Sequence, residues 1–333
     1  MNNWSTTTAK PSRSFRRAGP MRVLNDAEVT RLMDRRRTVE LMAEGYSADA
    51  RGEIFPLPRS RTQAHDLTVA WMGAAIPSTD VLGFRSYLYN QDGADRGDQI
   101  VALYRHSTME LKGLFLGCLI GNLRTGAAIA AALRFVRPNL EAIGLLGTGT
   151  QARQALACAV AALPLKSVWA WSPNSGRREG FRRWAEEALH VHVRLGDDAE
   201  SVVREAEAVA LVTSSETSVV TQEMLAKPKL LVSINSYRRP EIDLRLLEEA
   251  PLIWTDSIEQ ASGPGGLFQG DAMRGKLRKL ADPEALRELR DESSTRIVIN
   301  TGAAWEEVLL AESLWRSAEE LDVGLQTTLL NQP

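Results

Sequence analysis

The sequence has little cysteine, almost no net charge and no signal-like apolar segment at its start. Its 333 residues include 2 cysteines, and 40 Lys and Arg stand against 42 Asp and Glu, giving a net charge of −2. Two cysteines in apolar surroundings give neither a disulfide framework nor a metal-site spacing, so we expect a reduced, cytoplasmic setting. The even charge argues against nucleic acid or a membrane surface as a partner. No apolar run approaches the ~20 residues of a membrane span.

Length and the first residues set the domain expectations. At 333 residues the chain is long for one core, so two domains are expected. Residues 1–19 are polar with scattered basic side chains and no apolar segment, which is unlike a secretory signal and predicts a disordered lead. The four histidines show no ligand spacing with cysteine or carboxylate, so no metal is predicted.

The chain is organised around residues 141–163, which read as a short apolar strand, a glycine turn and an alanine-rich helix. Gly147 allows a sharp turn, Gly149 leaves room for a diphosphate, and Ala152 lets the helix pack closely on the strand. Backbone N–H groups at the helix start would face the phosphates. Glycine turns also occur between strand and helix for packing alone, but the flanking strand and helix favour a dinucleotide site. The predicted cofactor-binding residues here are Gly147, Thr148, Gly149, Thr150, Gln151 and Ala152.

The segments before and after this loop differ in their predicted secondary structure. Asn25 and Glu28 have capping-box spacing and predict a helix start. Residues 54–104 read as short antiparallel strands, which 114–120 continue, and 122–135 read as a helix. After the loop, strands and helices alternate, as in a parallel sheet with helices on both faces, and a last helix is expected from about Ala303 to Leu321. The predicted class is α/β.

The order of these elements predicts two domains. Residues 123–297 would form a Rossmann dinucleotide-binding domain. Residues 20–122 and 298–330 flank it and would form one discontinuous α+β substrate domain. A cleft is then expected between that domain and the carboxyl edge of the parallel sheet.

Several spaced motifs carry a family resemblance. They are Pro58-Arg59, Leu123-Arg124-Thr125-Gly126-Ala127-Ala128, the glycine loop, Val212-Thr213-Ser214-Ser215, Thr255-Asp256-Ser257 and Gly302-Ala303-Ala304-Trp305-Glu306-Glu307. In this order they resemble the ornithine cyclodeaminase/mu-crystallin family, which also holds alanine and ketimine dehydrogenases. The resemblance implies a substrate domain that also dimerises, and hydride transfer between nicotinamide C4 and an amino or imino carbon beside a carboxylate. It implies cofactor contacts at Thr213 and Ser214.

The resemblance also implies substrate arginines. Arg124 stands at the family's carboxylate-binding arginine, and its planar fork suits bidentate binding. An interdomain salt bridge is the alternative for this residue. Arg59 matches a second substrate arginine, although Arg61 is close enough to leave the register open.

Three departures from the family concern the site. Arg85 stands where the family usually has lysine, and arginine cannot act as an acid or base at working pH. Tyr237 stands where cyclodeaminases and alanine dehydrogenases have an aspartate. Tyr237 could donate a proton or pack against nicotinamide or substrate, and packing is favoured. Ile299 replaces a lysine that precedes the late glycine.

The strand end after the glycine loop bears on the cofactor. An NAD-selective site usually has Asp or Glu here for the ribose 2′-OH, and none is present. Ser172 and Asn174 can hydrogen-bond, and Arg177 or Arg178 can pair with a 2′-phosphate. These arginines could instead be ordinary first-turn residues, a poor place for them unless an anion is bound. NADP(H) is favoured over NAD(H).

The residues together predict an NADP(H)-dependent imine reductase or amino-acid or secondary-amine dehydrogenase, acting on a small carboxylate-bearing amino or imino acid as a homodimer. An NADPH-binding protein of mu-crystallin type with reduced catalysis is the alternative, favoured by the missing lysine and aspartate. An ornithine cyclodeaminase with bound NAD comes third.

Overall fold

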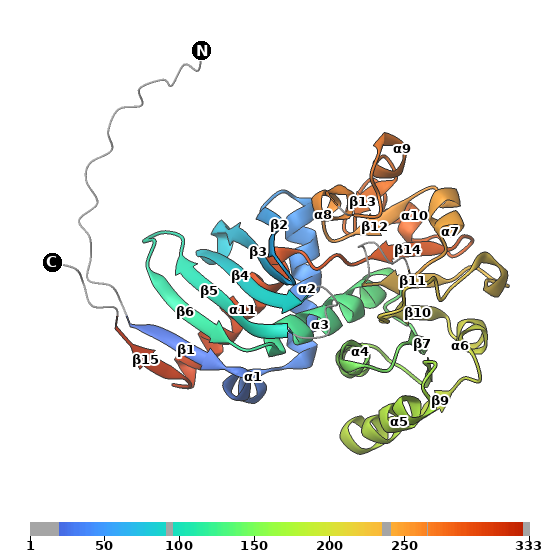
Figure 1. The fold of residues 1–333 in the computed structure, drawn as a ribbon, viewed down its shortest axis with the longest axis horizontal. Helices are drawn as coiled ribbons and strands as arrows, with labels where there is room; N and C mark the ends of the chain where they lie inside the picture. The colour runs from blue at the N-terminus through green and yellow to red at the C-terminus, as the bar shows by residue number, and fades with distance from the viewer. Residues whose placement is uncertain (1–19, 91–95, 235–240, 265, 329–333) are drawn as a thin grey trace, which may run out of the picture.

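Two sheets lie side by side in the computed structural model, which describes residues 20–90, 96–234, 241–264 and 266–328 (Figure 1). Helix α3 (Leu119–Val136) runs across the middle, from the edge of one sheet toward the other (Figure 1). The predicted combination of an α+β part and a Rossmann-type part is confirmed.

The first sheet has seven strands in the spatial order β15-β1-β6-β5-β4-β3-β2. Neighbours are antiparallel except β1 and β6, which are parallel. Helix α11 (Ala304–Glu320) packs against β3, β4 and β5, which confirms the predicted closing helix. The strands are β1 (Met21–Asn25), β2 (Phe55–Ala64), β3 (Leu67–Ile76), β4 (Val81–Asn90), β5 (Arg96–Arg105), β6 (Leu111–Leu116) and β15 (Leu325–Thr327).

Two helices follow β1, the short α1 (Asp26–Leu32) and the longer α2 (Arg35–Ala50). The Asn25 side chain accepts from the backbone N–H of Ala27 and of Glu28, and the Glu28 carboxylate accepts from the Asn25 N–H. The predicted capping box is confirmed. Its effect is to fix where the chain leaves the sheet.

Helix α3 begins earlier than the sequence suggested, because residues 119–120 were expected to continue a strand and are helical instead. Gly117 has a φ of +124°, which ends β6, and the helix follows directly. The Asp26 carboxylate then accepts from the backbone N–H of Cys118 (3.1 Å) and Leu119 (2.9 Å). A side chain 92 residues upstream therefore caps the helix start, which sequence patterns cannot show.

The second sheet is entirely parallel, with the order β13-β12-β14-β11-β10-β7-β8-β9. Alternate residues of β10 join two different apolar clusters, Ala208 and Ala210 one and Val209 and Leu211 the other, so both faces are buried. The strands are β7 (Ala142–Leu146), β8 (Ser167–Trp171), β9 (Val193–Leu195), β10 (Ala208–Leu211), β11 (Leu230–Ser233), β12 (Ile253–Thr255), β13 (Leu277–Lys279) and β14 (Arg296–Ile299).

Helices alternate with these strands, as the sequence predicts. They are α4 (Thr150–Ala162), α5 (Ser175–Leu189), α6 (Ala199–Glu205), α7 (Leu244–Glu249), α8 (Ile258–Ser262), α9 (Asp271–Arg274) and α10 (Leu286–Arg290), with a 3₁₀ turn at Gln222–Met224. A second 3₁₀ turn, Pro77–Thr79, joins β3 to β4 in the first sheet. Both α3 and β14 extend across the expected domain boundaries at 123 and 298, so that division stays a prediction.

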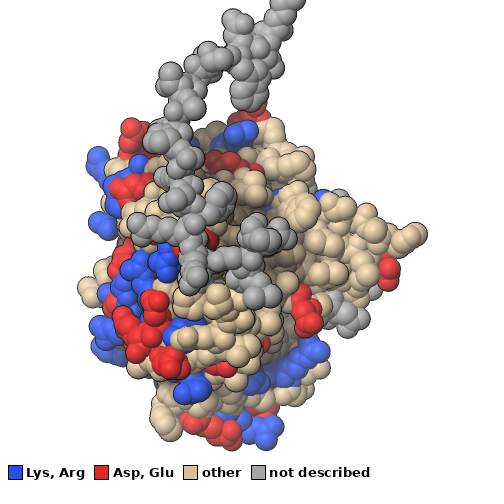
Figure 2. Space-filling view, turned by 90° about the vertical axis from the view of Figure 1, so that its left-hand side faces the viewer, with Lys and Arg blue, Asp and Glu red and all other residues tan. Residues whose placement is uncertain are grey.

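Helix α3 is long and apolar enough to cross a membrane by length and composition alone, although the sequence analysis expected no such segment. It is 78% buried, packed against α2, α4 and α11, so it is the core helix of this fold. Basic and acidic side chains lie next to one another over the face drawn in Figure 2, which presents no extended surface of one sign.

Candidate active site

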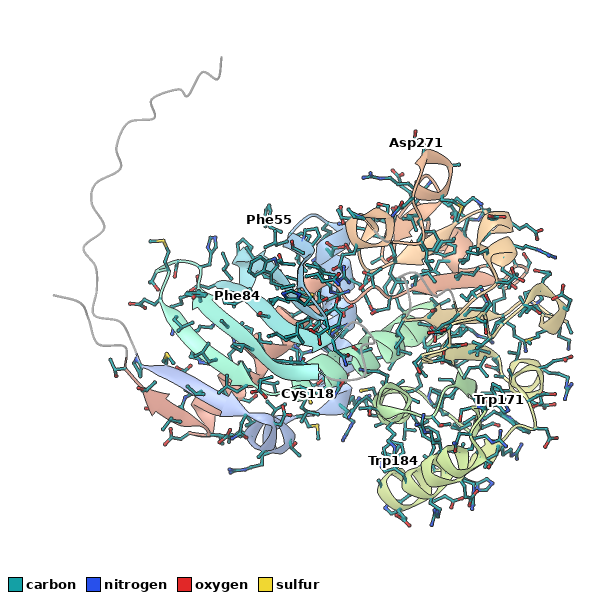
Figure 3. The ribbon with its side chains drawn as sticks, in the orientation of Figure 1. Phe55, Phe84, Cys118, Trp171, Trp184 and Asp271 are labelled. Atoms are coloured by element: carbon teal, nitrogen blue, oxygen red, sulfur yellow. The ribbon has the colours of Figure 1, made fainter. Side chains whose placement is uncertain are left out.

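A cavity of about 1200 Å³ lies between the carboxyl ends of β7, β8 and β10 and the segment that joins β6 to α3. The chain leaves β7 for β8 on one side and returns to β10 on the other, so the cavity sits at the topological switch point of the sheet. Cys118 marks the side of the first sheet and Trp171 the side of the parallel sheet (Figure 3). The lining includes residues 147–151, 171–174, 177 and 212–215, and from the other side Asp26, 97–99, Gly117, Cys118 and Asn122.

The glycine loop has the geometry of a diphosphate cradle. Gly147 has a φ of +110°, and a Cβ there would lie 2.4 Å from the backbone oxygen of Val212. A Cβ on Gly149 would meet nothing within 4 Å, and Gly149 is the N-cap of α4 without any side-chain cap. The first N–H groups of a 13-residue helix therefore face the cavity. These residues fit a dinucleotide.

Helix α3 packs directly on α4, the helix that follows the glycine loop. A Cβ on Gly126 of α3 would lie 2.4 Å from the backbone of Gln154 in α4, so only glycine allows the two helices to approach this closely. At the cavity, the Gln151 amide donates to the Asn122 side-chain oxygen at 3.0 Å. The positions of the two halves of the cleft are thereby tied together.

The end of β8 carries three predicted cofactor residues. The Ser172 and Thr148 hydroxyls are 2.8 Å apart. Asn174 caps α5 by accepting from the Arg177 backbone N–H at 2.8 Å. The exposed Arg177 lines the cavity, whereas the Arg178 guanidinium donates to the Ser172 carbonyl at 2.7 Å. Of the two candidates for a 2′-phosphate partner, Arg177 is thus the one that faces the cavity.

Beyond β10, Thr213 and Ser214 line the cavity as predicted. The Thr213 backbone N–H donates to the Glu241 carboxylate at 2.5 Å, and the Ser233 hydroxyl donates to the same carboxylate at 2.6 Å. Glu241 is buried and so links the ends of β10 and β11. Nothing local in the sequence indicated this positioning role.

Arg124 lies in α3 and is buried between two carboxylates of α11. Its Nε donates to Glu307 at 2.6 Å and its Nη1 donates to Glu306 at 3.0 Å. Burial acts to lower the pKa of Arg124, but Glu307 and Glu306 outweigh it and raise that pKa. Arg124 is therefore a permanently charged group. The salt bridge that was the alternative for Arg124 is therefore present, and its partners belong to the motif Gly302-Ala303-Ala304-Trp305-Glu306-Glu307.

Arg85 lies on the inner face of β4 and shares the Glu307 oxygen with Arg124. Its Nη1 donates to Glu307 and its Nη2 to the Gln99 side-chain oxygen, while its guanidinium carbon stands 4.4 Å from the centre of the Tyr87 ring. Burial lowers the pKa of Arg85, which Glu307 counteracts. One carboxylate thus bridges two arginines from different elements.

Arg59, on β2, lies beside the turn before α11. Its Nη2 donates to the backbone oxygens of Thr301 (3.3 Å) and Gly302 (3.0 Å). Arg61 instead donates to the Tyr89 hydroxyl at 3.2 Å, away from that turn. Of the two arginines between which the sequence left the choice open, Arg59 is therefore the one beside the turn that precedes α11.

We define the arginine cluster as Arg59, Arg85, Arg124, Glu306 and Glu307, and two further polar groups, Asp256 and Asn300, hold its surroundings in place. The Asp256 carboxylate accepts from the backbone N–H of Thr301 (2.6 Å) and Ala303 (2.7 Å), and the Asn300 amide donates to Glu306 at 3.0 Å. Burial and the nearby Asp256 raise the pKa of Glu306 well above its usual value, although Arg124 opposes this. We expect a proton to be held more tightly there than on an exposed glutamate.

The arginine cluster stands behind the cavity rather than in its wall. Gln99, the hydrogen-bond partner of Arg85, lines the cavity, whereas Arg59, Arg85 and Arg124 are not among the described residues that line it. Tyr237 falls outside the described residues. Ile299 is part of an apolar cluster, so nothing polar replaces the family's lysine at that position. The described part of the chain holds no group of three or more His, Cys, Asp or Glu that could bind a metal.

Comparison with known proteins assigns the family. The model of the ornithine cyclodeaminase/mu-crystallin family matches residues 20–291. The chain belongs to this family. A Delta(1)-pyrroline-2-carboxylate reductase of Bacillus cereus (strain ATCC 10987 / NRS 248) is 23% identical over 237 residues, covering 68% of this chain and 72% of the relative.

Solved structures share the fold of this family member over nearly its whole length. The Delta(1)-pyrroline-2-carboxylate reductase of Thermococcus litoralis, in complex with NADH and L-proline, has a TM-score of 0.79 at 17% identity, covering 92% of this chain and 99% of that one. A lysine cyclodeaminase described for its recognition of L-lysine, L-ornithine and L-2,4-diaminobutyric acid has a TM-score of 0.79 at 27% identity, covering 94% and 96%. The predicted fold and family are confirmed.

Proposed function

We propose that this protein is an NADP(H)-dependent oxidoreductase that acts on the C–N bond of a carboxylate-bearing amino or imino acid. The observation that carries the proposal is the cavity at the switch point, which has an open helix N-terminus at one end and the arginine cluster behind the other. The pyrroline-2-carboxylate reductases among its relatives support reduction of a C=N bond. Neighbours that bind NAD(H) support a nicotinamide dinucleotide in general.

Each half of the cavity has its own task. The N–H groups at 149–151 would bind the diphosphate, and Gly149 leaves the space for it. Bound there, the nicotinamide supplies the hydride. The chain's other contribution is orientation: fixed positive charge from Arg85 and Arg124 would hold the substrate carboxylate end, so that the neighbouring carbon faces the cofactor.

Turnover is tested by NADPH oxidation with Delta(1)-pyrroline-2-carboxylate, a six-membered cyclic imino acid, and 2-oxo acids mixed with amines. We expect turnover with at least one imino acid and none with the matching carboxamide, because the cluster selects a carboxylate. Equal rates with acid and carboxamide would contradict carboxylate recognition. No turnover on the whole panel would overturn the enzymatic proposal.

The preference for NADP(H) rests on Arg177 at the cavity and on the absence of an acidic residue at 172–174. Replacing Arg177 with alanine should weaken NADPH binding about tenfold, since one charge-assisted contact is lost, and leave NADH binding unchanged. Arg183→Ala, an exposed position on the same helix, is the control. Binding is read from cofactor fluorescence. An equal loss for NADPH and NADH would contradict a 2′-phosphate contact.

A second candidate is an NADPH-binding protein with little catalysis, of mu-crystallin type. The observation in its favour is that Arg85 and Arg124 are already paired with the protein's own carboxylates. Calorimetry separates the two: tight NADPH binding without turnover across the panel supports the binder. An ornithine cyclodeaminase, the third reading, would instead release ammonia from ornithine or lysine.

The first sheet supports the proposed homodimer through its outer face. Strand pairing places Leu82, Phe84, Trp71 and Ile100 on this face, and all four side chains are exposed. Phe84 and Phe55 lie on this sheet, away from the parallel sheet (Figure 3). Large exposed apolar faces mark interaction sites, and a second copy of the chain is the proposed occupant. Phe84→Glu should give monomers in analytical ultracentrifugation, whereas an unchanged sedimentation coefficient would contradict the dimer at this face.

A further inference from the structure

Gln99 occupies a place between the arginine cluster and the cavity. It lies on β5 directly opposite Tyr87 of β4, and Arg85 lies two residues before Tyr87, so all three side chains share the inner face of the sheet. The Gln99 side chain is 4% exposed, yet the residue lines the cavity. Its side-chain oxygen accepts from Arg85 Nη2.

That hydrogen bond fixes the orientation of the Gln99 amide. A guanidinium has donors only, so the group of Gln99 that faces Arg85 must be its oxygen. The amide NH₂ is then turned away from Arg85. Arg85 is itself held from the other side by Glu307 and cannot swing freely. A chain of contacts Glu307–Arg85–Gln99 thus leads from the buried cluster to the cavity and ends in an N–H donor.

We propose that Gln99 is a substrate-binding residue that donates an amide N–H to the substrate carboxylate, and that Arg85 is a positioning residue acting through Gln99. This rests on the proposed function and refines it, since it names the cavity-facing contact behind which the arginines stand. Arg85 contributes by polarising and aiming the amide, because hydrogen bonds to a charged partner strengthen their neighbours in a low-dielectric interior.

Other polar groups at this end of the cavity are less suited to a carboxylate. The Asn122 amide faces the Cys118 sulfur at 3.8 Å, and its oxygen already accepts from Gln151. Asp26 has its oxygens on the N–H groups of Cys118 and Leu119 and, like the exposed Asp98, would repel an anion. Gln99 is the neutral donor backed by a cation.

The test uses Gln99→Glu and Gln99→Leu in the full-length protein. In Gln99→Glu the new carboxylate still pairs with Arg85 but faces the substrate with negative charge, so KM for the imino acid should rise at least about tenfold while kcat changes little. Gln99→Leu should raise KM by a similar factor. NADPH affinity should stay unchanged in both. Gln63→Glu and Gln63→Leu, at an exposed position of β2, are the controls.

A double-mutant cycle tests the positioning role of Arg85. If Arg85 acts through Gln99, Arg85→Met and Gln99→Leu each raise KM, and the double variant raises it no further than the worse single variant. Multiplying effects would show that Arg85 contacts the substrate independently, which overturns its positioning role. Thermal unfolding and NADPH binding identify any Arg85 variant that fails to fold, and the Gln99 variants then decide alone.

A binding arm separates this inference from the proposed function. Pyrrole-2-carboxylate, a planar cyclic acid, and pyrrole-2-carboxamide are titrated into the NADPH complex by calorimetry. The inference expects the acid to bind more tightly than the amide in the wild type, with that preference lost or reversed in Gln99→Glu. This outcome without any turnover upholds Gln99 and overturns the enzymatic proposal. Turnover with KM no more altered by the Gln99 than by the Gln63 variants upholds the enzyme and overturns Gln99. Neither turnover nor acid binding overturns both.

Discussion

The cofactor side and the substrate side of the cleft differ in how their polar and charged groups are exposed and paired. On the cofactor side the functional groups are open: Gly149 faces free space, α4 has no side-chain cap, and Arg177 is exposed at the cavity. On the substrate side the charged groups are closed off, because Arg85 and Arg124 are buried and bonded to Glu307. The start of α4 in the cofactor wall thus has no side-chain cap, whereas the charges behind the substrate wall are paired within the protein.

The difference follows from what each wall must hold. Backbone N–H groups at a helix start stay hydrated and cost little when no anion is bound. Buried guanidinium groups without partners would be far more costly, so acidic side chains must compensate them. The protein therefore keeps its positive charge in a cluster that is paired with carboxylates, and Gln99, a neutral amide bonded to Arg85, lies between this cluster and the cavity.

The largest expected effect is on the closed wall. Arg124→Met leaves Glu306 and Glu307 with one ion-pair partner fewer in a buried setting, which should cost about 3–5 kcal/mol of unfolding free energy. The matched control is Arg134→Met on the same helix. Arg134 lies 3.8 Å from Glu40, and because this ion pair is partly exposed it contributes little to stability. Urea unfolding compares them. Equal losses of unfolding free energy in the two variants would contradict the buried ion pairing of Arg124.

The two loop glycines separate fold from ligand. Gly147→Ala should destabilise the protein by about 2 kcal/mol or more, because the positive φ is strained and the Cβ meets Val212 backbone. Gly149→Ala should leave stability within about 0.5 kcal/mol, since its Cβ meets nothing. It should still weaken NADPH binding strongly by filling the diphosphate space. A stable Gly147→Ala, or a Gly149→Ala with normal NADPH affinity, would contradict the comparison of the walls.

The pH dependence of stability probes Glu306. Its pKa is raised in the folded protein, so the folded state retains a proton that the unfolded state loses above about 4.5, the usual value. Stability should therefore fall as pH rises above that value, by at most about 1.4 kcal/mol per pH unit. Glu306→Gln removes this contribution, so its stability relative to the wild type should improve between pH 5 and 8. A constant difference across that range would show that the folded protein holds no more protons on Glu306 than the unfolded chain does.

The smallest effect is expected at Gly121. A Cβ there would lie 2.6 Å from Arg85 Nη2, so Gly121→Ala should push this nitrogen away from the Gln99 oxygen at a smaller cost in stability than a clash with backbone would cause. We expect KM to rise a few-fold through Gln99. The control on the same helix is Gly126→Ala, whose Cβ meets the backbone of Gln154 and should lower the melting temperature instead. Unchanged KM in Gly121→Ala would argue that Arg85 does not aim Gln99.

The residues of the cofactor side could be predicted from the sequence, and those of the substrate side only in part. The glycine loop, Ser172 and Asn174 are predictable because each lies at a strand end followed by a turn, a local pattern, whereas Thr213 was implied by the family resemblance. The start of α3 was misjudged because its cap comes from Asp26. The sequence alone does not predict a role for Gln99, because a glutamine in an alternating strand stands out only when its neighbours across the sheet are known.

The sequence by itself determined the order of elements and the cofactor loop, since these depend on short spacings and on the period of apolar residues. Its motifs also carried the resemblance to the family that the family model confirms. Tertiary structure alone decided the state of the arginines. Arg124 and Glu307 lie 183 residues apart, and Arg85 and Glu307 lie 222 apart. Buried charges must find opposite partners wherever the fold supplies them, and no spacing along the chain reveals which carboxylate that is.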